Sequence, residues 1–141
     1  MSQSSMSERI YRGHPGPGVR VEGLALVAAD NFSARYDLDL NKGIFSRPTH
    51  RLAGESYVGR ILVLNIAKGG VATAWMLRAM VESGRAPKAL ILNSANPIMA
   101  QGAAFAALAL IDRFEIDITA AIRTGETVIC DPAAGTLTVR A

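Results

Sequence analysis

The order of hydrophobic and polar positions divides the chain into extended and helical segments. Two nearly continuous apolar runs occupy residues 59–66 and 88–94, a pattern typical of strands that are covered on both faces. Rough alternation of apolar and polar residues predicts further strands at 19–28, 113–118, 126–131 and 136–141. A Pro-Ala-Ala-Gly turn separates the last two, so we expect them to form a hairpin.

Helical spacing marks two segments between these strands. Residues 71–83 place Arg78 and Glu82 four residues apart on one side, and they place apolar side chains on the other side, namely Met76, Leu77, Met80 and Val81. Trp75 and the methionines at this spacing are interpreted as core residues rather than as a cofactor site. An alanine-rich segment at 97–111 begins with Pro97 and favours a second helix.

The sum of these elements is an α/β fold in a single domain. Residues 19–141 form the predicted domain, and residues 1–18 are expected to be a flexible N-terminal lead-in. The segment 31–56 is irregular, with two short extended pieces, "ARYDLDL" and "GIFS", on either side of a turn at 41–43.

Composition narrows the class of protein. Half of the 141 residues are hydrophobic, which excludes a disordered chain. The formal net charge is +3 and the basic residues are scattered, so neither nucleic-acid nor membrane-surface binding is expected. No uninterrupted apolar run of 18 residues predicts a membrane span. The single cysteine, Cys130, excludes an internal disulfide framework, fits a reducing cytoplasm, and is interpreted as a small apolar filler.

The stretch "ILVLNIAKGGVATAWML", residues 61–77, contains the strongest candidate for a binding site. Lys68, Gly69 and Gly70 lie between a predicted strand and a predicted helix. Unpaired N–H groups at a helix start, a close-approaching backbone and a lysine can together hold a carboxylate or phosphate. The alternative is that the glycines are ordinary turn residues and that Lys68 is solvated. The spacing differs from that of a P-loop.

Other candidate groups point less clearly to chemistry. His14 and His50 are distant in sequence and have no Cys or Glu at ligand spacing, so no metal site is expected within this chain. Asp37 and Asp39 are two residues apart and would share one face of a strand. They are either a carboxylate pair for acid–base work or part of a solvated strand face.

Several short motifs, in order and at similar spacing, resemble the small swivelling subunit of the aconitase X family over roughly residues 19–141. The matching positions are Lys42-Gly43, His50-Arg51-Leu52 with Gly54, Gly59 to Leu64, then Gly84, Ala86, Pro87, Ala89 and Ile91, and finally Gly125, Glu126, Val128, Asp131, Gly135, Leu137 and Val139.

This resemblance implies a swivelling β/β/α domain that closes over a large catalytic subunit. Members of the family are hydro-lyases that remove water from small hydroxy acids, such as mevalonate 5-phosphate or cis-3-hydroxy-L-proline. The large subunit is expected to carry an iron or iron–sulfur centre, and this chain is expected to bind no cofactor of its own and to be inactive alone.

The resemblance also assigns roles at the glycine turn. Residues 67–70 stand where the family has the turn "SRGS", so that Lys68 replaces its arginine and Gly70 replaces the serine thought to accept a proton. Lys68, Gly69 and Gly70 are the expected substrate-binding residues. Thr73, one helical turn further on, is the nearest hydroxyl and the candidate catalytic residue.

Three interpretations of this departure remain open. The chain is a working dehydratase subunit whose base comes from Thr73 or from the partner, or it belongs to a related lyase or isomerase that needs no base from this side. In the third interpretation it is a binding or regulatory module that keeps the fold without lyase chemistry.

Overall fold

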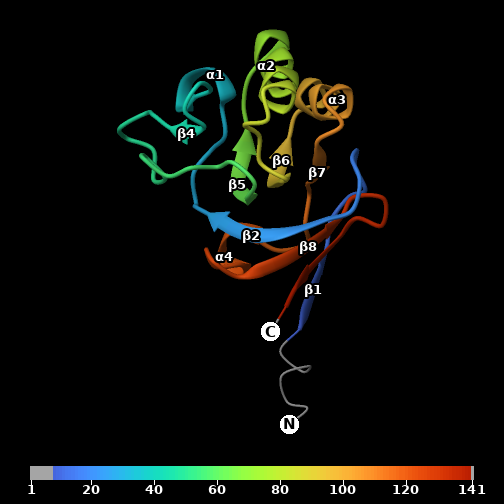
Figure 1. Cartoon of the computed structure of the whole chain (residues 1–141). Helices are drawn as coiled ribbons and strands as arrows, with labels where there is room; N and C mark the ends of the chain where they lie inside the picture. The colour runs from blue at the N-terminus through green and yellow to red at the C-terminus, as the bar shows by residue number, and fades with distance from the viewer. Residues whose placement is uncertain (1–7, 141) are drawn as a thin grey trace.

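A computed structural model describes residues 8–140, and its elements form one mixed sheet with helices (Figure 1). The strands of the main sheet are β1 (Arg9–Arg12), β2 (Val21–Val27), β5 (Ile61–Ala67), β6 (Ala89–Ala95), β7 (Ala109–Ile111), β8 (Thr127–Asp131) and β9 (Thr136–Val139). The helices are α1 (Ala34–Asp37), α2 (Val71–Glu82), α3 (Pro97–Phe105) and α4 (Ile118–Ala121), and a small separate pair is formed by β3 (Leu38–Asp39) and β4 (Ile44–Phe45).

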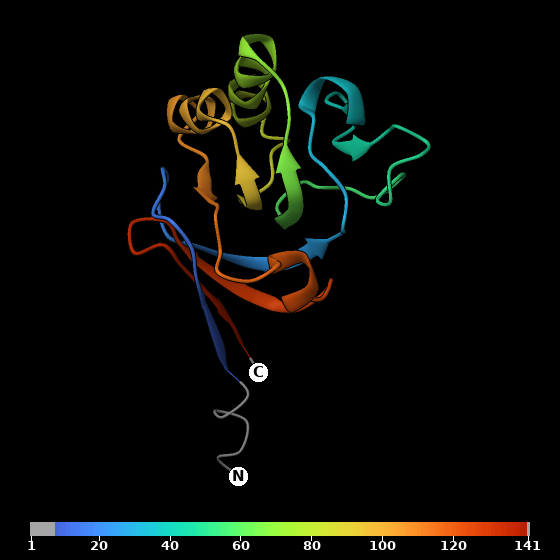
Figure 2. The same cartoon turned by 180° about the vertical axis from the view of Figure 1, so that it is seen from behind.

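Strand β2 joins the two halves of the sheet, whose strand order is β1-β9-β8-β2-β5-β6-β7. Its first residues, Val21 to Leu24, pair antiparallel with β8, and its last, Ala25 to Val27, pair parallel with β5. Figures 1 and 2 show the consequence: the parallel strands carry α2 and α3, while β2 and β8 turn beneath them. This arrangement is the predicted α/β fold with β-rich ends.

The parallel strands are buried on both faces, as their apolar runs predicted. In β5, Leu62 and Leu64 belong to the hydrophobic core beneath α2 and α3. Ile61 and Val63 alternate with them and belong to a second core, which the antiparallel strands close. All four side chains are fully buried.

Helix α2 confirms the predicted helix at 71–83, although two of its apolar residues, Val81 and Trp75, are exposed. Leu77 and Met80 are buried, and Arg78 pairs with Glu82 at 3.2 Å across one helical turn. Trp75, however, is not a core residue, because 61% of it is exposed. Its side chain lies outside the apolar stripe and stacks on Phe105 of α3.

Two predictions for the second half of the chain, the end of one helix and the presence of one strand, are wrong. The helix expected at 97–111 ends at Phe105, because Ala107 has a φ of 55° and the chain re-enters the sheet as β7, parallel to β6. The strand expected at 113–118 does not form. Arg113 has a φ of 58°, and Asp117 caps the short helix α4 instead.

Two predictions in the first half also need correction. The lead-in expected at 1–18 is wrong for residues 9–12, which form β1 and pair antiparallel with β9; residues 1–7 lie outside the described part of the chain. The extended piece expected at "ARYDLDL" starts instead as the helical turn α1, capped by the Ser33 side chain, before it becomes β3.

The interpretation of Cys130 as a core residue is confirmed. The thiol is fully buried, and burial raises its pKa to about 12, which makes it a poor nucleophile. Among the described helices, none has the length and apolar character that a membrane span requires. The cytoplasmic location stays a prediction.

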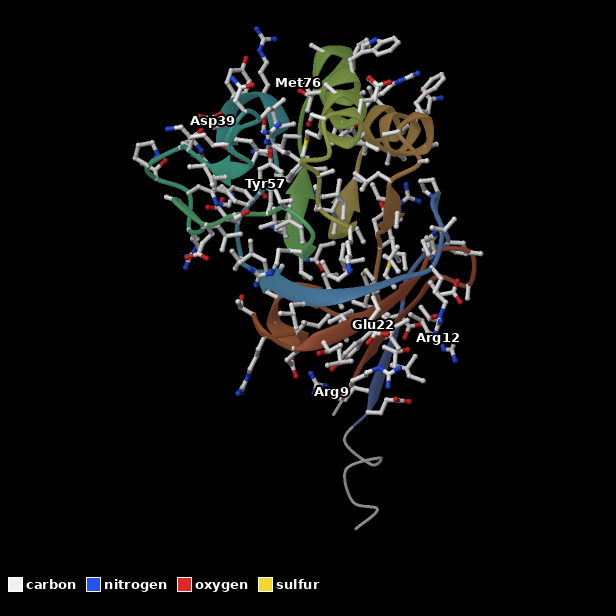
Figure 3. The ribbon with its side chains drawn as sticks, viewed as in Figure 1. Arg9, Arg12, Glu22, Asp39, Tyr57 and Met76 are labelled. Atoms are coloured by element: carbon white, nitrogen blue, oxygen red, sulfur yellow. The ribbon has the colours of Figure 1, made fainter. Side chains whose placement is uncertain are left out.

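Tyr57 provides a test of the core packing. Its side chain is fully buried with its ring edge on Phe45, and its hydroxyl has no hydrogen-bond partner among residues 8–140 (Figure 3). Burial raises the pKa of Tyr57 to about 12. Because an unpaired buried hydroxyl is unfavourable, Tyr57→Phe should raise the free energy of unfolding by about 1 kcal/mol.

The matched control is Tyr11→Phe, since the Tyr11 hydroxyl accepts a hydrogen bond from Arg9 Nε at 2.9 Å. This variant should be no more stable than the wild type. Urea denaturation of both variants measures the difference, and a destabilised Tyr57→Phe would contradict the expectation.

Candidate functional site

The two glycines between β5 and α2 have different backbone requirements. Gly69 has a φ of +128°, and a Cβ there would lie 2.5 Å from the Thr73 hydroxyl oxygen. Gly70 has a φ of −111°, within the ordinary range, and a Cβ there would meet nothing within 4 Å. The fold of this chain therefore requires glycine at position 69 but not at position 70.

The start of α2 provides unpaired donors next to a positive charge. Gly70 is the N-cap residue and has no side chain to accept from the first N–H groups of the 12-residue helix. Lys68 is exposed, and it forms no ion pair within the part of the chain that the structure describes. The helix dipole and the ammonium group together favour an anion at this turn.

Main-chain pairing on one side and a side chain on the other hold the turn in place. Phe32 donates its N–H to the Ile66 carbonyl at 2.9 Å and accepts from the Lys68 N–H at 2.8 Å, so the segment after β2 continues the sheet beside β5. On the other side, Asn96 Nδ2 donates to the Gly69 carbonyl at 3.0 Å. Asn96 also caps α3, which links the starts of both helices.

A groove opens beside the turn and has a volume of about 460 Å³. Its lining residues come from three separate segments: Asp30, Asn31, Ser33, Tyr36, Asp37, Arg47, Lys68 and Gly69. The sequence analysis singled out Lys68, Gly69 and Asp37, but it missed the contributions of Asp30, Tyr36 and Arg47. We call this feature the polar groove below.

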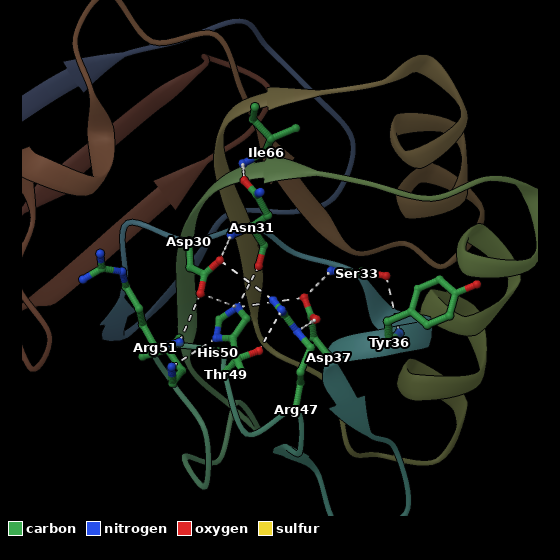
Figure 4. Close-up of polar contacts among 11 residues, drawn as sticks. Asp30, Asn31, Ser33, Tyr36, Asp37, Arg47, Thr49, His50, Arg51 and Ile66 are labelled. Atoms are coloured by element: carbon green, nitrogen blue, oxygen red, sulfur yellow. Dashed lines mark hydrogen bonds and ion pairs between the residues drawn. The ribbon is translucent and has the colours of Figure 1, made fainter.

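His50 lies at the centre of a polar network beneath the groove (Figure 4). Its side chain is fully buried. Nε2 lies 2.7 Å from the Asn31 carbonyl oxygen, and Nδ1 accepts from the Leu52 N–H at 3.0 Å. Because a carbonyl oxygen can only accept, Nε2 carries a proton and donates it to Asn31, while Nδ1 is the acceptor, and these two hydrogen bonds fix the orientation of the ring.

Two carboxylates flank this imidazole. Asp30 Oδ2 and Asp37 Oδ2 lie 3.8 and 3.9 Å from His50 Nε2. Burial raises the pKa of Asp30, but N–H donors from Arg51 and Asn31, together with the electrostatic influence of His50 and Arg47, outweigh burial, so that the pKa falls below the ordinary 3.8. Asp30 is therefore an anion at neutral pH.

Asp37 is not part of a solvated strand face, as one interpretation of the sequence had it. It is only 3% exposed, pairs with Arg47 Nε at 2.6 Å, and accepts from the Ser33 N–H at 3.1 Å. Asp39 instead accepts from the N–H groups of Asn41 and Lys42 in the following turn. The two carboxylates have separate partners and do not act as a pair.

The remaining candidates are placed as follows. Thr73 is buried, with 2% exposed, and packs under Gly69 rather than lining the groove. His14 bridges to Asp112 just after β7, at one edge of the sheet, whereas His50 contacts Asn31 after β2, so the two histidines are not brought together. Within residues 8–140, no group of three His, Cys, Asp or Glu side chains is placed to hold a metal ion.

The fold and the glycine turn beside a polar groove place this chain in the class of small α/β swivelling domains. Comparison with known proteins identifies its family. The family model described as aconitase X swivel domain matches residues 10–139. The chain belongs to this family. The family predicted from the sequence motifs is thereby confirmed.

Similar proteins agree with this assignment. The phosphomevalonate dehydratase small subunit of Methanocella arvoryzae is 32% identical over 88% of this chain and 94% of its own length. The protein of the same name from Archaeoglobus fulgidus is 34% identical over 82% of this chain and 87% of its own. The crystal structure of Thermococcus kodakaraensis aconitase X in its holo-form matches 94% of this chain, with a TM-score of 0.87 and 26% identity. The names of these similar proteins confirm the prediction that this chain is the small subunit of a dehydratase.

The structure predicts that His50 holds the groove together. His50→Ala leaves the Asn31 carbonyl and the Leu52 N–H without their partner and opens a cavity beside Phe45, which stacks on the imidazole. We expect a loss of about 2–4 kcal/mol in the free energy of unfolding. Chemical denaturation measures this loss.

His50→Gln serves as the control, because its amide nitrogen can reach the position of Nε2 and donate to the Asn31 carbonyl. It should recover part of the lost stability. Equal stability of the alanine and glutamine variants would show that the hydrogen bond to Asn31 is unimportant.

Proposed function

We propose that this chain binds the carboxylate or phosphate of a small hydroxy acid at the start of α2 and closes over the active site of a large aconitase X subunit. The observation that carries this proposal is the uncapped helix start at Gly70 beside the exposed Lys68. The names of the similar proteins support a large partner and a dehydration reaction.

The residues of this chain would bind and orient the substrate. Lys68 and the first N–H groups of α2 hold one anionic group, and Gly69 keeps the backbone close to it. Arg47, although paired with Asp37, adds a second cationic group, a guanidinium, to the same groove. Closure against the partner excludes water and strengthens each of these electrostatic contacts.

Dehydration requires that a C–H proton be removed while the hydroxyl leaves as water. Gly70 offers no group to accept this proton. Thr73 stays the sequence-based candidate, but its buried hydroxyl packs under Gly69. We therefore propose that Thr73 supports the turn and that the large subunit supplies the proton acceptor.

The iron or iron–sulfur centre is likewise proposed to belong to the large subunit. The described residues of this chain provide no ligand set for it, and Cys130 is buried in the core with a raised pKa.

A second candidate function is a binding or regulatory module that keeps the fold. The absence of a hydroxyl at Gly70 favours it, since the resemblance places the family serine there. Kinetics separate the two functions: the large subunit alone and with this chain should be assayed on mevalonate 5-phosphate and on cis-3-hydroxy-L-proline. A dehydratase subunit produces turnover that depends on its addition, whereas a module binds without creating turnover.

Lys68→Ala should weaken substrate binding in the complex of the two subunits. Loss of one charged hydrogen bond corresponds to about 1–3 kcal/mol, or about a 5- to 150-fold rise in KM. Lys42→Ala, which removes an exposed lysine from the turn between β3 and β4, is the control and should change nothing. Steady-state kinetics measure both variants. An unchanged KM for Lys68→Ala would contradict the proposal that Lys68 binds the anionic group of the substrate.

The two glycines of the turn should respond differently to substitution. Gly69→Ala forces a Cβ against Thr73 at a φ that L-residues avoid, so it should lower the free energy of unfolding by about 1–3 kcal/mol. Gly70→Ser has room and provides an N-cap oxygen, so it should raise stability by a few tenths of a kcal/mol. Thermal melts test the pair, and the reverse order of stability would refute the geometry of the turn.

A further inference from the structure

An apolar groove lies between α2 and α3, outside the polar groove. We call it the α2–α3 groove; it has a volume of about 120 Å³ and is flanked by Val71, Trp75, Ile98 and Phe105. Their exposed fractions are 62%, 61%, 40% and 74%. The rings of Trp75 and Phe105 stack at 6.4 Å with 15° between their planes. Four large apolar side chains are thus held toward solvent at one place.

The base of this groove is built from small residues. A Cβ on Gly102 would lie 2.8 Å from Ala74 Cα, so the backbones of the two helices are in close contact there. The four larger apolar side chains therefore project toward solvent on both sides of a shallow groove. Arg78 lies at the rim and its charge is paired with Glu82. Aromatic side chains around a desolvated centre with an arginine nearby are typical of the energetic centre of a protein interface.

The α2–α3 groove is continuous with the substrate-binding turn. Val71 directly follows Gly70, and Ile98 is two residues beyond Asn96, whose side chain bonds to the Gly69 carbonyl. Both helices follow parallel strands, so they run in the same direction away from the turn. Any protein surface that covers the turn therefore meets the groove within one helical turn.

We infer that the α2–α3 groove is the docking surface for the large catalytic subunit, which inserts an apolar side chain beside Trp75 and Phe105. This inference rests on the proposed function. The turn needs a partner that supplies a proton acceptor, and such a partner must pass over Gly69 and Gly70. A second copy of this chain would cover the turn without bringing that group, so it does not fit the same requirement.

The experiment uses the full chain and the purified large aconitase X subunit of the same organism, with binding measured by calorimetry. Trp75→Asp and Phe105→Asp place a charge in the groove and should each weaken association at least tenfold. Val19→Asp is the matched control, because Val19 is exposed to the same 74% as Phe105 but lies before β2, away from α2 and α3. It should bind within twofold of the wild type.

Folding and catalysis are separated from docking by two further measurements. Thermal melts show whether each aspartate variant is folded. If an aspartate variant is unfolded, the glutamine variant at the same position, Trp75→Gln or Phe105→Gln, is used in its place. At saturating small subunit, turnover of the groove variants should approach the wild-type value. Lys68→Ala should show the opposite pattern, with unchanged subunit affinity and a raised KM.

Three outcomes would overturn the inference. Folded groove variants that bind the large subunit within twofold of the wild type would refute the docking surface and leave the proposed function intact. The same holds if the chain self-associates in sedimentation experiments and the groove variants abolish only that self-association. A wild-type chain that does not bind the large subunit at all would refute both the docking surface and the proposed function.

Discussion

The parallel pairing of β2 with β5, and its continuation beyond the strands, is the interaction on which the site depends. After β2 ends, Phe32 still pairs with the chain at Ile66 and Lys68. This extension places the segment 30–37 alongside the Lys-Gly-Gly turn. Without it, the carboxylates of one loop and the lysine of the next would not face the same groove.

Charge in the polar groove is balanced rather than simply positive. Asp30 and Asp37 are opposed by Arg47 and Lys68, and the imidazole of His50 fixes the loop backbone underneath. Arg47 is restrained by its carboxylate partner, whereas Lys68 has no such partner among the described residues. Lys68 is therefore the cation that is available to an incoming anion, while Arg47 is already oriented for a second contact.

The division of tasks between this chain and its proposed partner follows from the chemistry of the surface. One end of α2 and α3 presents polar groups that can hold an anion, and the adjacent groove presents apolar side chains that can hold a protein. In the proposed complex, the first set would orient the substrate and the second would attach the domain to its partner. A swivelling domain needs both, because a substrate ligand is useful only when the domain closes in a reproducible position.

The sequence by itself determined the local elements with strong signals. The buried runs that became β5 and β6, the amphipathic helix α2, the final hairpin and the family all follow from residue order. The end of α3 and the loop that follows β7 were not predicted, because Ala107 and Arg113 adopt positive φ angles that are unusual for alanine and arginine. Trp75 was misassigned, since helical spacing does not say which flank a neighbouring helix covers. The polar groove was decided only by tertiary structure: Asp30, Arg47 and Lys68 are distant in sequence, and the parallel pairing of β2 with β5 brings them together.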